Sequence, residues 1–224
     1  MSDLGLIMND AMARACHEGR KTVTRRPLSV QPPTSIGMHP VDLTYRNGEL
    51  LGYAASDFPV WSGGPATIPG AGTAKVGARV WIRECWTPVD GDGWGLPRGG
   101  NPIHKHPNSV VYRASAGDSW KFGDCTWRPS IHMPKWAART WGRIVSVRPE
   151  RLQDITDDDA RREGCTEGFV ARGMLPHVAA FRSVWNDCYA NRGLGWDANP
   201  WVWRIEWERI ERPDFAEFGS TGST

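Results

Sequence analysis

The sequence predicts an α+β fold, built round a small, curved and mainly antiparallel sheet or barrel with flanking helices. Its clearest strand is the segment 201–210, where large apolar side chains alternate with other residues in a period of two. Apolar residues recur at helical spacing in two separate places, 4–18 and 178–190. Because strands and helices are mixed without a βαβ repeat, an α+β class is favoured over a parallel α/β fold.

Composition is that of an ordinary globular protein. Of the 224 residues, 40% are hydrophobic and 23% are charged, which excludes a disordered chain, a membrane protein and a coiled coil. The 25 glycines and 17 prolines predict many loops and turns. We expect one domain over 1–212, with insertions at about 28–72 and 87–127 and a flexible tail at 213–224.

Charge and cysteine content restrict the partners and the cellular compartment that we expect for the protein. The formal net charge of +2 is too small to predict nucleic-acid binding by itself, although 121–151 is locally basic and 154–167 locally acidic. The 5 cysteines are odd in number and include no CxxC pair. Since we find no secretory leader and no long apolar run, we expect free thiols, a cytoplasmic protein and no membrane partner.

The first elements expected are a helix and a strand. The helix covers 4–18 and is closed by Gly19, since glycine commonly ends helices. Residues 20–26 follow as a strand or turn, because β-branched residues favour extended backbone. Prolines punctuate 28–72 and predict an irregular insertion with one small hairpin at Asn47-Gly48.

Three strands are expected in the middle of the chain, at 80–84, 110–113 and 140–149. A helix then begins at Thr156, whose hydroxyl can cap it, and ends near Gly164. Asp159 occupies the position that completes a capping box.

The second helix covers about 178–190 and precedes the strand at 201–210. Its predicted apolar face consists of four residues, Phe181, Val184, Trp185 and Cys188.

The chain holds 13 tryptophans, and we expect most of them to build the core. Those on predicted strands and helices are Trp81, Trp185, Trp201, Trp203 and Trp207. Those left for loops or a cleft are Trp86, Trp127, Trp136 and either Trp61 or Trp94.

The basic segment 19–26 carries the strongest chemical signal. It reads Gly19-Arg20-Lys21-Thr22-Val23-Thr24-Arg25-Arg26, with four cations and two hydroxyls in a short run. Such a run can hold an anion or activate a nucleophile. On chemistry alone, a phosphate site and a plain surface strand are equally consistent with it.

Here the sequence resembles a known family. Gly19-x-Lys21-x-x-x-x-Arg26 is similar to the signature of ASCH domains, relatives of the PUA fold. Further segments resemble the phage and prophage branch of that family: 77–84, 128–137, 151–156 with 163–164, and 196–203. Together they span nearly the whole chain in the family's order. The resemblance implies a PUA-like fold, with a small curved barrel and flanking helices.

The resemblance also implies an activity. Small bacterial ASCH proteins are amidohydrolases that remove the acetyl group from N4-acetylcytidine, using a Lys, a Thr and a Glu. On this sequence the matching residues are Lys21, Thr24 and Glu163. Thr24 would attack the acyl carbonyl with Lys21 as its base, and Glu163 would position Lys21 or relay a proton to the leaving amine. From the residues alone, a structural Lys21–Glu163 ion pair and a plain strand Thr24 are favoured.

Further residues are expected to bind substrate. They are Arg20, Arg26, Glu84, Ser130, His132, Lys135 and Trp136. Glu84 follows an apolar strand and is equally explained as half of a buried ion pair. Ser130, His132, Lys135 and Trp136 lie in a segment that combines cations with aromatics, as phosphate and base contacts do. A rigid loop over the barrel mouth is the plainer interpretation of that segment.

Two other classes of function stay open: a non-catalytic module for RNA, DNA or modified bases, and a metal-dependent ribonuclease. The run 157–159 could hold Mg²⁺, but a helix N-terminus explains its aspartates more simply. His104-Lys105-His106 lacks the other ligands of a zinc site. We expect no cofactor or metal, a modified nucleoside or nucleic acid as partner, and a monomer or weak dimer. A phage-encoded chain would act in the bacterial host cytoplasm.

Overall fold

The computed structural model describes residues 3–29, 31–32, 35–36, 39–40, 42–46, 49–55, 58–62, 67–68, 72–90, 100, 107–116, 126–166 and 176–213. The chain divides into two compact units. The first comprises Met1–Leu4, Arg20–Arg79 and Arg143–Glu208. The second comprises Gly5–Gly19, Val80–Gly142 and Arg209–Thr224.

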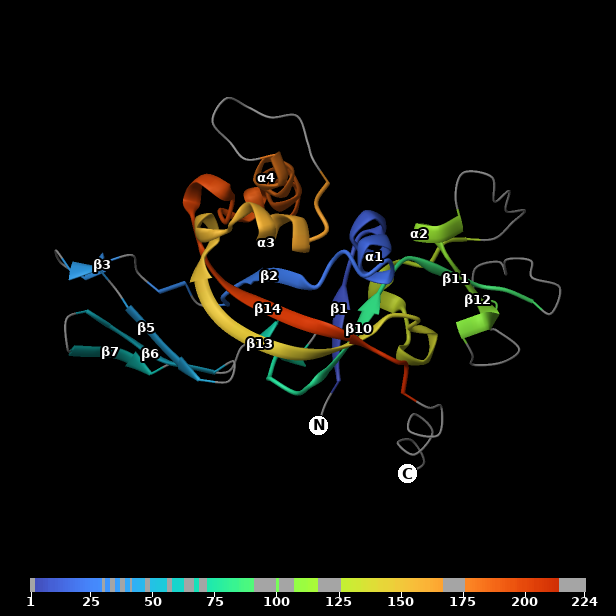
Figure 1. Cartoon of the computed structure of the whole chain (residues 1–224), viewed down its shortest axis with the longest axis horizontal. Helices are drawn as coiled ribbons and strands as arrows, with labels where there is room; N and C mark the ends of the chain where they lie inside the picture. The colour runs from blue at the N-terminus through green and yellow to red at the C-terminus, as the bar shows by residue number, and fades with distance from the viewer. Residues whose placement is uncertain are drawn as a thin grey trace. The chain divides into compact units, whose positions relative to one another are not determined.

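The central element is a five-stranded sheet with the order β1-β10-β13-β14-β2 (Figure 1). Its strands are Leu4–Ile7, Arg79–Arg83, Trp141–Arg151, Trp201–Ile210 and Val23–Pro27, in that order. The mixture of this sheet with helices confirms the α+β class. In the described part of the chain the sheet is open, with β1 and β2 at its edges, so the expected small barrel is not closed there.

In the first unit, helices α3 (Asp157–Arg162) and α4 (Pro176–Tyr189) lie together over one face of the sheet (Figure 1). Phe181 and Trp185 of α4 pack with Leu152 and Val202 in one buried cluster. Both expected helices are therefore present. Cys188, placed on the apolar face of the second helix by its spacing, is exposed instead. Short 3-10 turns complete the unit at Leu152–Asp154, Ala190–Arg192 and Trp196–Ala198.

Strand β14 differs from its prediction in one respect. The alternation predicted one apolar face, and Trp203, Ile205 and Trp207 are indeed buried. Val202 and Arg204, between them, are buried as well. The helices cover this second face of the strand, and Arg204 is accommodated there by carboxylates.

The insertion between β2 and β10 contains more regular structure than expected. Its strands form the sheets β3-β4, β5-β6-β7 and β8-β9. They are Ser35–Ile36, His39–Pro40, Asp42–Arg46, Glu49–Ala55, Phe58–Ser62, Thr67–Ile68 and Gly72–Thr73. Arg46 pairs antiparallel with Glu49, which confirms the hairpin predicted at Asn47-Gly48, two residues that lie outside the described ones.

The N-terminal prediction was wrong in its first half. A helix was expected over 4–18, but β1 is followed by the shorter helix α1 (Asp10–His17), with Asn9 accepting a hydrogen bond from the Met12 amide. A Cβ on Gly5 would lie 2.9 Å from Cζ2 of Trp81, so this glycine permits close approach of the indole. Sheet pairing therefore outweighs the helical spacing of these residues. Gly19 has a φ of +79° just beyond α1, as expected of a glycine after a helix.

The second unit is built round indole rings. Strand β11 (Trp86–Pro88) pairs with β12 (Val110–Tyr112), which is flanked by the 3-10 turn Pro107–Ser109 and by α2 (Arg113–Ala116). Its buried cluster includes Trp81, Trp86, Tyr112, Met133 and Trp141. Two further 3-10 turns cover Ser130–His132 and Lys135–Ala137.

The tryptophans largely follow their predicted places. Trp81, Trp185, Trp203 and Trp207 are buried, whereas Trp201 is half-buried. Trp86 corrects the prediction of a loop or cleft position, because it is buried on β11. Trp94 and the side chain of Trp61 lie outside the described residues.

The described cysteines are free thiols; Cys16, Cys85 and Cys165 are buried and Cys188 is exposed. A search of the described residues finds no helix long and apolar enough to cross a bilayer. The expected flexible tail lies outside the described residues from 214 onward, and so does His104-Lys105-His106.

Candidate functional site

The start of β2 and the end of α3 meet in the first unit. Lys21 stands two residues before β2, and Glu163 is the C-cap residue of α3. The Thr22 amide donates to the Arg162 carbonyl at 2.9 Å, and the Trp207 amide donates to the Thr22 carbonyl at 3.0 Å. These backbone bonds hold the segment before β2 against both α3 and β14.

The ammonium of Lys21 is buried and fully hydrogen-bonded. Nζ donates to Glu163 Oε2 at 2.5 Å, to the Glu163 carbonyl at 2.7 Å and to the Val23 carbonyl at 2.9 Å. The Lys21 and Glu163 side chains are 2% and 4% exposed. An ammonium has three N–H donors, and here each has an oxygen acceptor. Two of the three predicted catalytic residues are therefore in direct contact.

Arg25 contacts the other oxygen of the Glu163 carboxylate. Its NH1 lies 3.2 Å from Glu163 Oε1, its Nε donates to Glu150 Oε1 at 2.7 Å, and its NH2 donates to Asp159 Oδ2 at 2.7 Å. Burial by itself lowers the pKa of Arg25, but the three carboxylates outweigh it and raise that pKa. Sequence reasoning treated Arg25 only as one cation of a basic run, and nothing in its spacing singled it out.

Asp159 also joins a second set of ion pairs, which links α3 to strand β14. Arg204 donates to Asp159 Oδ1 at 2.8 Å and to Glu206 Oε2 at 2.8 Å. Although burial raises the pKa of Asp159, hydrogen bonds from Arg204 and Arg25 lower it to about 2. Arg162 pairs with Glu206 in turn. The Asp159 carboxylate therefore pairs with arginines, while the Asp159 backbone amide donates a hydrogen bond to the hydroxyl of the N-cap residue Thr156 at 3.1 Å.

Thr24 is buried on β2, on the face of the sheet opposite Arg25. Thr24 pairs with Ile205 and Arg25 pairs with Arg204. Since neighbouring residues of a strand point to opposite faces, Thr24 points away from the face on which Arg25 and Arg204 hold Asp159. The oxygens that Lys21 contacts belong to Val23 and Glu163. The structure therefore does not bring the Thr24 hydroxyl into this hydrogen-bond cluster.

The two flanking arginines have separate environments. Arg20 is exposed, and its NH1 lies 3.5 Å from the Gly164 carbonyl. Arg26 is half-buried and donates to the Tyr189 hydroxyl at 3.2 Å. Both lie in the first unit, and Arg20 is the cation most open to solvent in the motif.

Cys165 lies two residues beyond Glu163 and is buried. Burial, with a smaller contribution from the Glu163 charge, raises the pKa of its thiol to about 11. Burial and the raised pKa both disfavour the thiolate, which is the nucleophilic form of cysteine.

Glu84 lies in the second unit, where both of its oxygens are taken by Arg139. Arg139 donates to them at 2.8 and 2.7 Å, and its guanidinium stacks 4.1 Å from the centre of the Tyr112 ring. Burial raises the pKa of Glu84, while Arg139 opposes that shift. This bidentate pair is the arrangement expected of a structural anchor.

The remaining predicted binding residues also belong to the second unit. Ser130 is half-buried and His132 is exposed, in one 3-10 turn. In the next turn, Lys135 Nζ lies 5.9 Å from the centre of the Trp141 ring. Trp136 packs edge-on against Trp86 with ring centroids 6.0 Å apart. Lys135 and Trp136 are thus partly occupied by contacts with core indoles.

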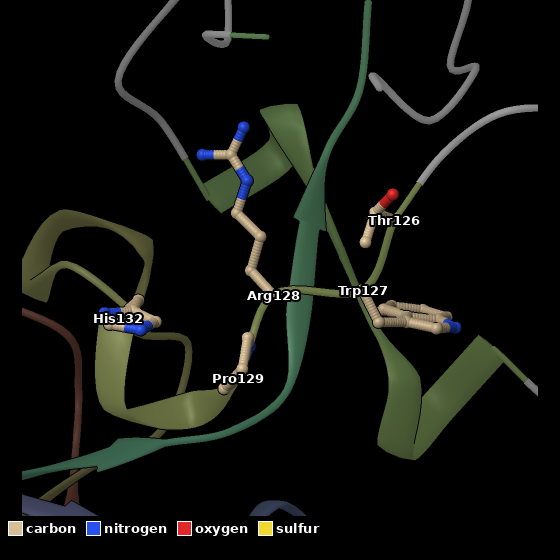
Figure 2. A pocket seen from close by; sticks show the side chains of 5 residues that line it. All are labelled: Thr126, Trp127, Arg128, Pro129 and His132. Carbon is tan, nitrogen blue, oxygen red and sulfur yellow. The ribbon is translucent and has the colours of Figure 1, made fainter. Parts of the chain in front are cut away.

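A pocket of about 420 Å³ opens beside this segment (Figure 2). It is lined by Thr126, Trp127, Arg128, Pro129 and His132. Figure 2 shows the Arg128 side chain extending away from the rings of Trp127 and His132. The Arg128 guanidinium also lies 5.0 Å from the centre of the Trp86 ring and donates to the Gly100 carbonyl. Of this lining, sequence reasoning named Trp127 and His132 and included Arg128 and Pro129 in the segment 128–137, but it missed Thr126.

The aspartates of the run 157–159 all have protein partners. Asp157 binds His177, with Oδ2 2.7 Å from Nδ1, and Asp158 pairs with Arg161. Within the described ranges, no group of three or more His, Cys, Asp or Glu side chains is placed to hold a metal ion. The run serves the helix N-terminus and the ion pairs around it.

Comparison with known proteins gave no match, whether to a protein-family model, to a curated protein or to a solved structure. The function is therefore inferred from the geometry of the site together with the resemblance of its residues to the ASCH motif.

Proposed function

We propose that the chain is an amidohydrolase of the ASCH, PUA-like type, which removes the acyl group from an N4-acylated cytidine or a similar modified nucleoside. One observation carries the proposal. Lys21 and Glu163, which the ASCH motif pairs as catalytic residues, are 142 positions apart in sequence and are in contact at 2.5 Å in a buried setting. Direct contact between these two side chains is what the proposed catalysis requires.

The Lys21–Glu163 contact supplies a route for the proton. A lysine acts as a base only when it is neutral, and Glu163 Oε2 is the nearest acceptor for a proton leaving Nζ. Transfer between the two leaves the total charge of the cluster unchanged. The amine then takes the proton of the Thr24 hydroxyl while Thr24 Oγ1 bonds to the acyl carbon.

Collapse of the tetrahedral intermediate breaks the bond between the acyl carbon and N4. The proton held by Lys21 passes to the departing amine, so cytidine leaves with its amino group restored. Water then cleaves the threonyl ester and releases the carboxylic acid. The balanced reaction is amide plus water to amine plus acid.

A local rearrangement precedes this step. The Val23 carbonyl that Lys21 contacts is bonded directly to the Thr24 nitrogen, so the ammonium already lies beside the backbone of the nucleophile. Because the Thr24 side chain points to the opposite face of the sheet, the proposed catalysis requires Nζ to leave the Val23 carbonyl and the Thr24 hydroxyl to turn toward it before the catalytic set is complete. Catalytic hydrogen bonds commonly form only when substrate is bound.

A non-catalytic nucleic-acid module is the second candidate. It is favoured by the complete hydrogen bonding of Lys21, and independently by the pocket that combines Trp127, Arg128 and His132. Cations of this kind contact phosphates and indoles stack on bases. Oligonucleotide binding that weakens steeply with salt, in the absence of turnover, would establish this candidate.

The experiment that tests the amidohydrolase compares four proteins on N4-acylated cytidine, with the products separated by mass spectrometry. They are the wild type, Thr24→Val, Lys21→Arg and the control Thr22→Val. Thr24→Val removes the hydroxyl and keeps a β-branched residue on β2. Lys21→Arg keeps the charge but supplies no base. We expect turnover in the wild type and in Thr22→Val only; an inactive wild type contradicts the proposal.

A further inference from the structure

We propose that Arg25 is the positioning residue of this site: it holds the Glu163 carboxylate so that one oxygen faces Lys21 Nζ. Its catalytic meaning rests on the proposed function, whereas the contact itself rests on geometry. Arg25 lies outside the ASCH motif residues that match this chain, since the motif names Lys21 and Arg26 on either side of it.

The two oxygens of Glu163 have different partners. Oε2 lies 2.5 Å from Lys21 Nζ and Oε1 lies 3.2 Å from Arg25 NH1. A carboxylate held at both oxygens cannot rotate about its terminal bond without breaking one of the two contacts. Arg25 therefore fixes the direction in which Glu163 presents Oε2.

Arg25 is itself immobilised from three sides. Glu150 comes from β13, whereas Asp159 and Glu163 come from α3 and its C-cap. The Arg25 side chain is fully buried, and its guanidinium lies 5.9 Å from the centre of the Phe181 ring. Each carboxylate is met by a different nitrogen of the planar guanidinium, whereas the three donors of a lysine ammonium radiate from one atom and cannot reproduce that spacing.

The charge of Arg25 matters as much as its shape. Without Arg25, the carboxylates of Glu150, Asp159 and Glu163 would lie close together and lack the buried cation that now contacts all three. Like charges repel, so the three carboxylates would no longer be held together in these positions. Glu163 would then lose the contact that keeps Oε2 directed at Lys21.

The test observes the Lys21 ammonium directly, by ¹⁵N-detected NMR of the folded protein, and needs no turnover. In the wild type, three acceptors protect the ammonium protons from exchange with water. We expect Arg25→Lys to broaden or remove this signal, as Glu163→Gln does. The matched control is Arg204→Lys, which disturbs the same network at Asp159 and Glu206 and leaves Glu163 untouched; its Lys21 signal is expected to persist.

A second variant covers the case in which Arg25→Lys does not fold. Glu150→Gln leaves every atom of Arg25 in place and removes one charged partner, so the Lys21 protons are expected to exchange faster than in wild type. A Lys21 signal that is unchanged in each folded variant of Arg25 and Glu150, while Glu163→Gln removes it, overturns the inference.

The kinetic readout separates a positioning role from general destabilisation. In Arg25→Lys we expect kcat to fall about 100-fold with KM little changed, since small misplacements carry that penalty. If the variants change the exchange of the Lys21 protons but the wild type shows no turnover, Arg25 still orients Glu163 and the proposed function is refuted. If the wild type turns over substrate but the variants leave Lys21 exchange unchanged, the role of Arg25 is refuted.

Discussion

Lys21 Nζ lies 2.5 Å from Glu163 Oε2, with both side chains withdrawn from solvent. Removing two charges from water is costly, and their mutual attraction repays that cost only when further hydrogen bonds complete the geometry. Two carbonyls complete it for Lys21, and Arg25 completes it for Glu163. The pair is therefore sensitive to the loss of either partner.

Glu163→Gln should reduce the free energy of unfolding by about 3 kcal/mol, because it leaves Lys21 and Arg25 with less compensation in a buried setting. Chemical denaturation measures this. The double variant Lys21→Met with Glu163→Gln should lose clearly less than the sum of the single variants, since they share one interaction. Additive losses would show that the two residues are not coupled.

Acid should destabilise the first unit through Asp159. Its pKa is lowered from its ordinary 3.8 to about 2 by Arg204 and Arg25, so the folded state holds the ionised form more tightly than the unfolded chain. This contribution is present above the ordinary pKa and is lost as pH falls from about 4 to 2. Denaturation curves over that range should depend less on pH in Asp159→Asn than in wild type. Equal pH dependence would contradict this assignment.

Cys165 should be inert and Cys188 reactive. Burial raises the pKa of the Cys165 thiol to about 11, whereas Cys188 is exposed. Alkylation follows the accessible thiolate. Peptide mass spectrometry after brief iodoacetamide treatment at neutral pH should therefore find Cys188 modified and Cys165 modified only after denaturation. Comparable rates in the folded protein would show that the Cys165 environment is open.

Glu84→Gln separates an anchoring role from a substrate-binding role. Because Glu84 is buried and held at both oxygens by Arg139, the variant should lower the free energy of unfolding by about 3 kcal/mol. A protein of unchanged stability with a raised KM would instead favour the substrate-binding role predicted from the sequence. Arg139→Lys, which keeps the charge and loses the fork, should lie between wild type and Glu84→Gln in stability.

The sequence predicted those elements whose local pattern agrees with their packing. The strand at 201–210, the Thr156 cap and the hairpin at Asn47-Gly48 all carry strong local signals. The strand Leu4–Ile7 was missed because its apolar residues also fit a helical spacing, and only pairing within the sheet decides between the two. Trp86 was misplaced for a similar reason, since its surrounding loop residues gave no sign of the cluster that buries it.

The site was predictable to a smaller extent. The Lys21–Glu163 contact was anticipated through resemblance to a family motif, because spacing alone cannot bring two such distant residues together. Arg25 could not be distinguished from Arg20 and Arg26 in the sequence. Its role depends on where β13 and α3 place their carboxylates, which is a property of tertiary structure. The position of Thr24 on the opposite face from Arg25 follows from the alternation of side chains along a strand, and so was open to prediction once 20–26 was taken as a strand.

The central claim, a threonine nucleophile served by the Lys21–Glu163 pair, is tested most directly by acid-quenching the protein during turnover of N4-acetylcytidine. The peptide that contains Thr24 is then analysed by mass spectrometry. We predict an added acetyl group on Thr24 in the wild type, and neither this adduct nor turnover in Thr24→Val. Undiminished deacetylation by Thr24→Val, or no deacetylation by the wild type, would contradict the claim.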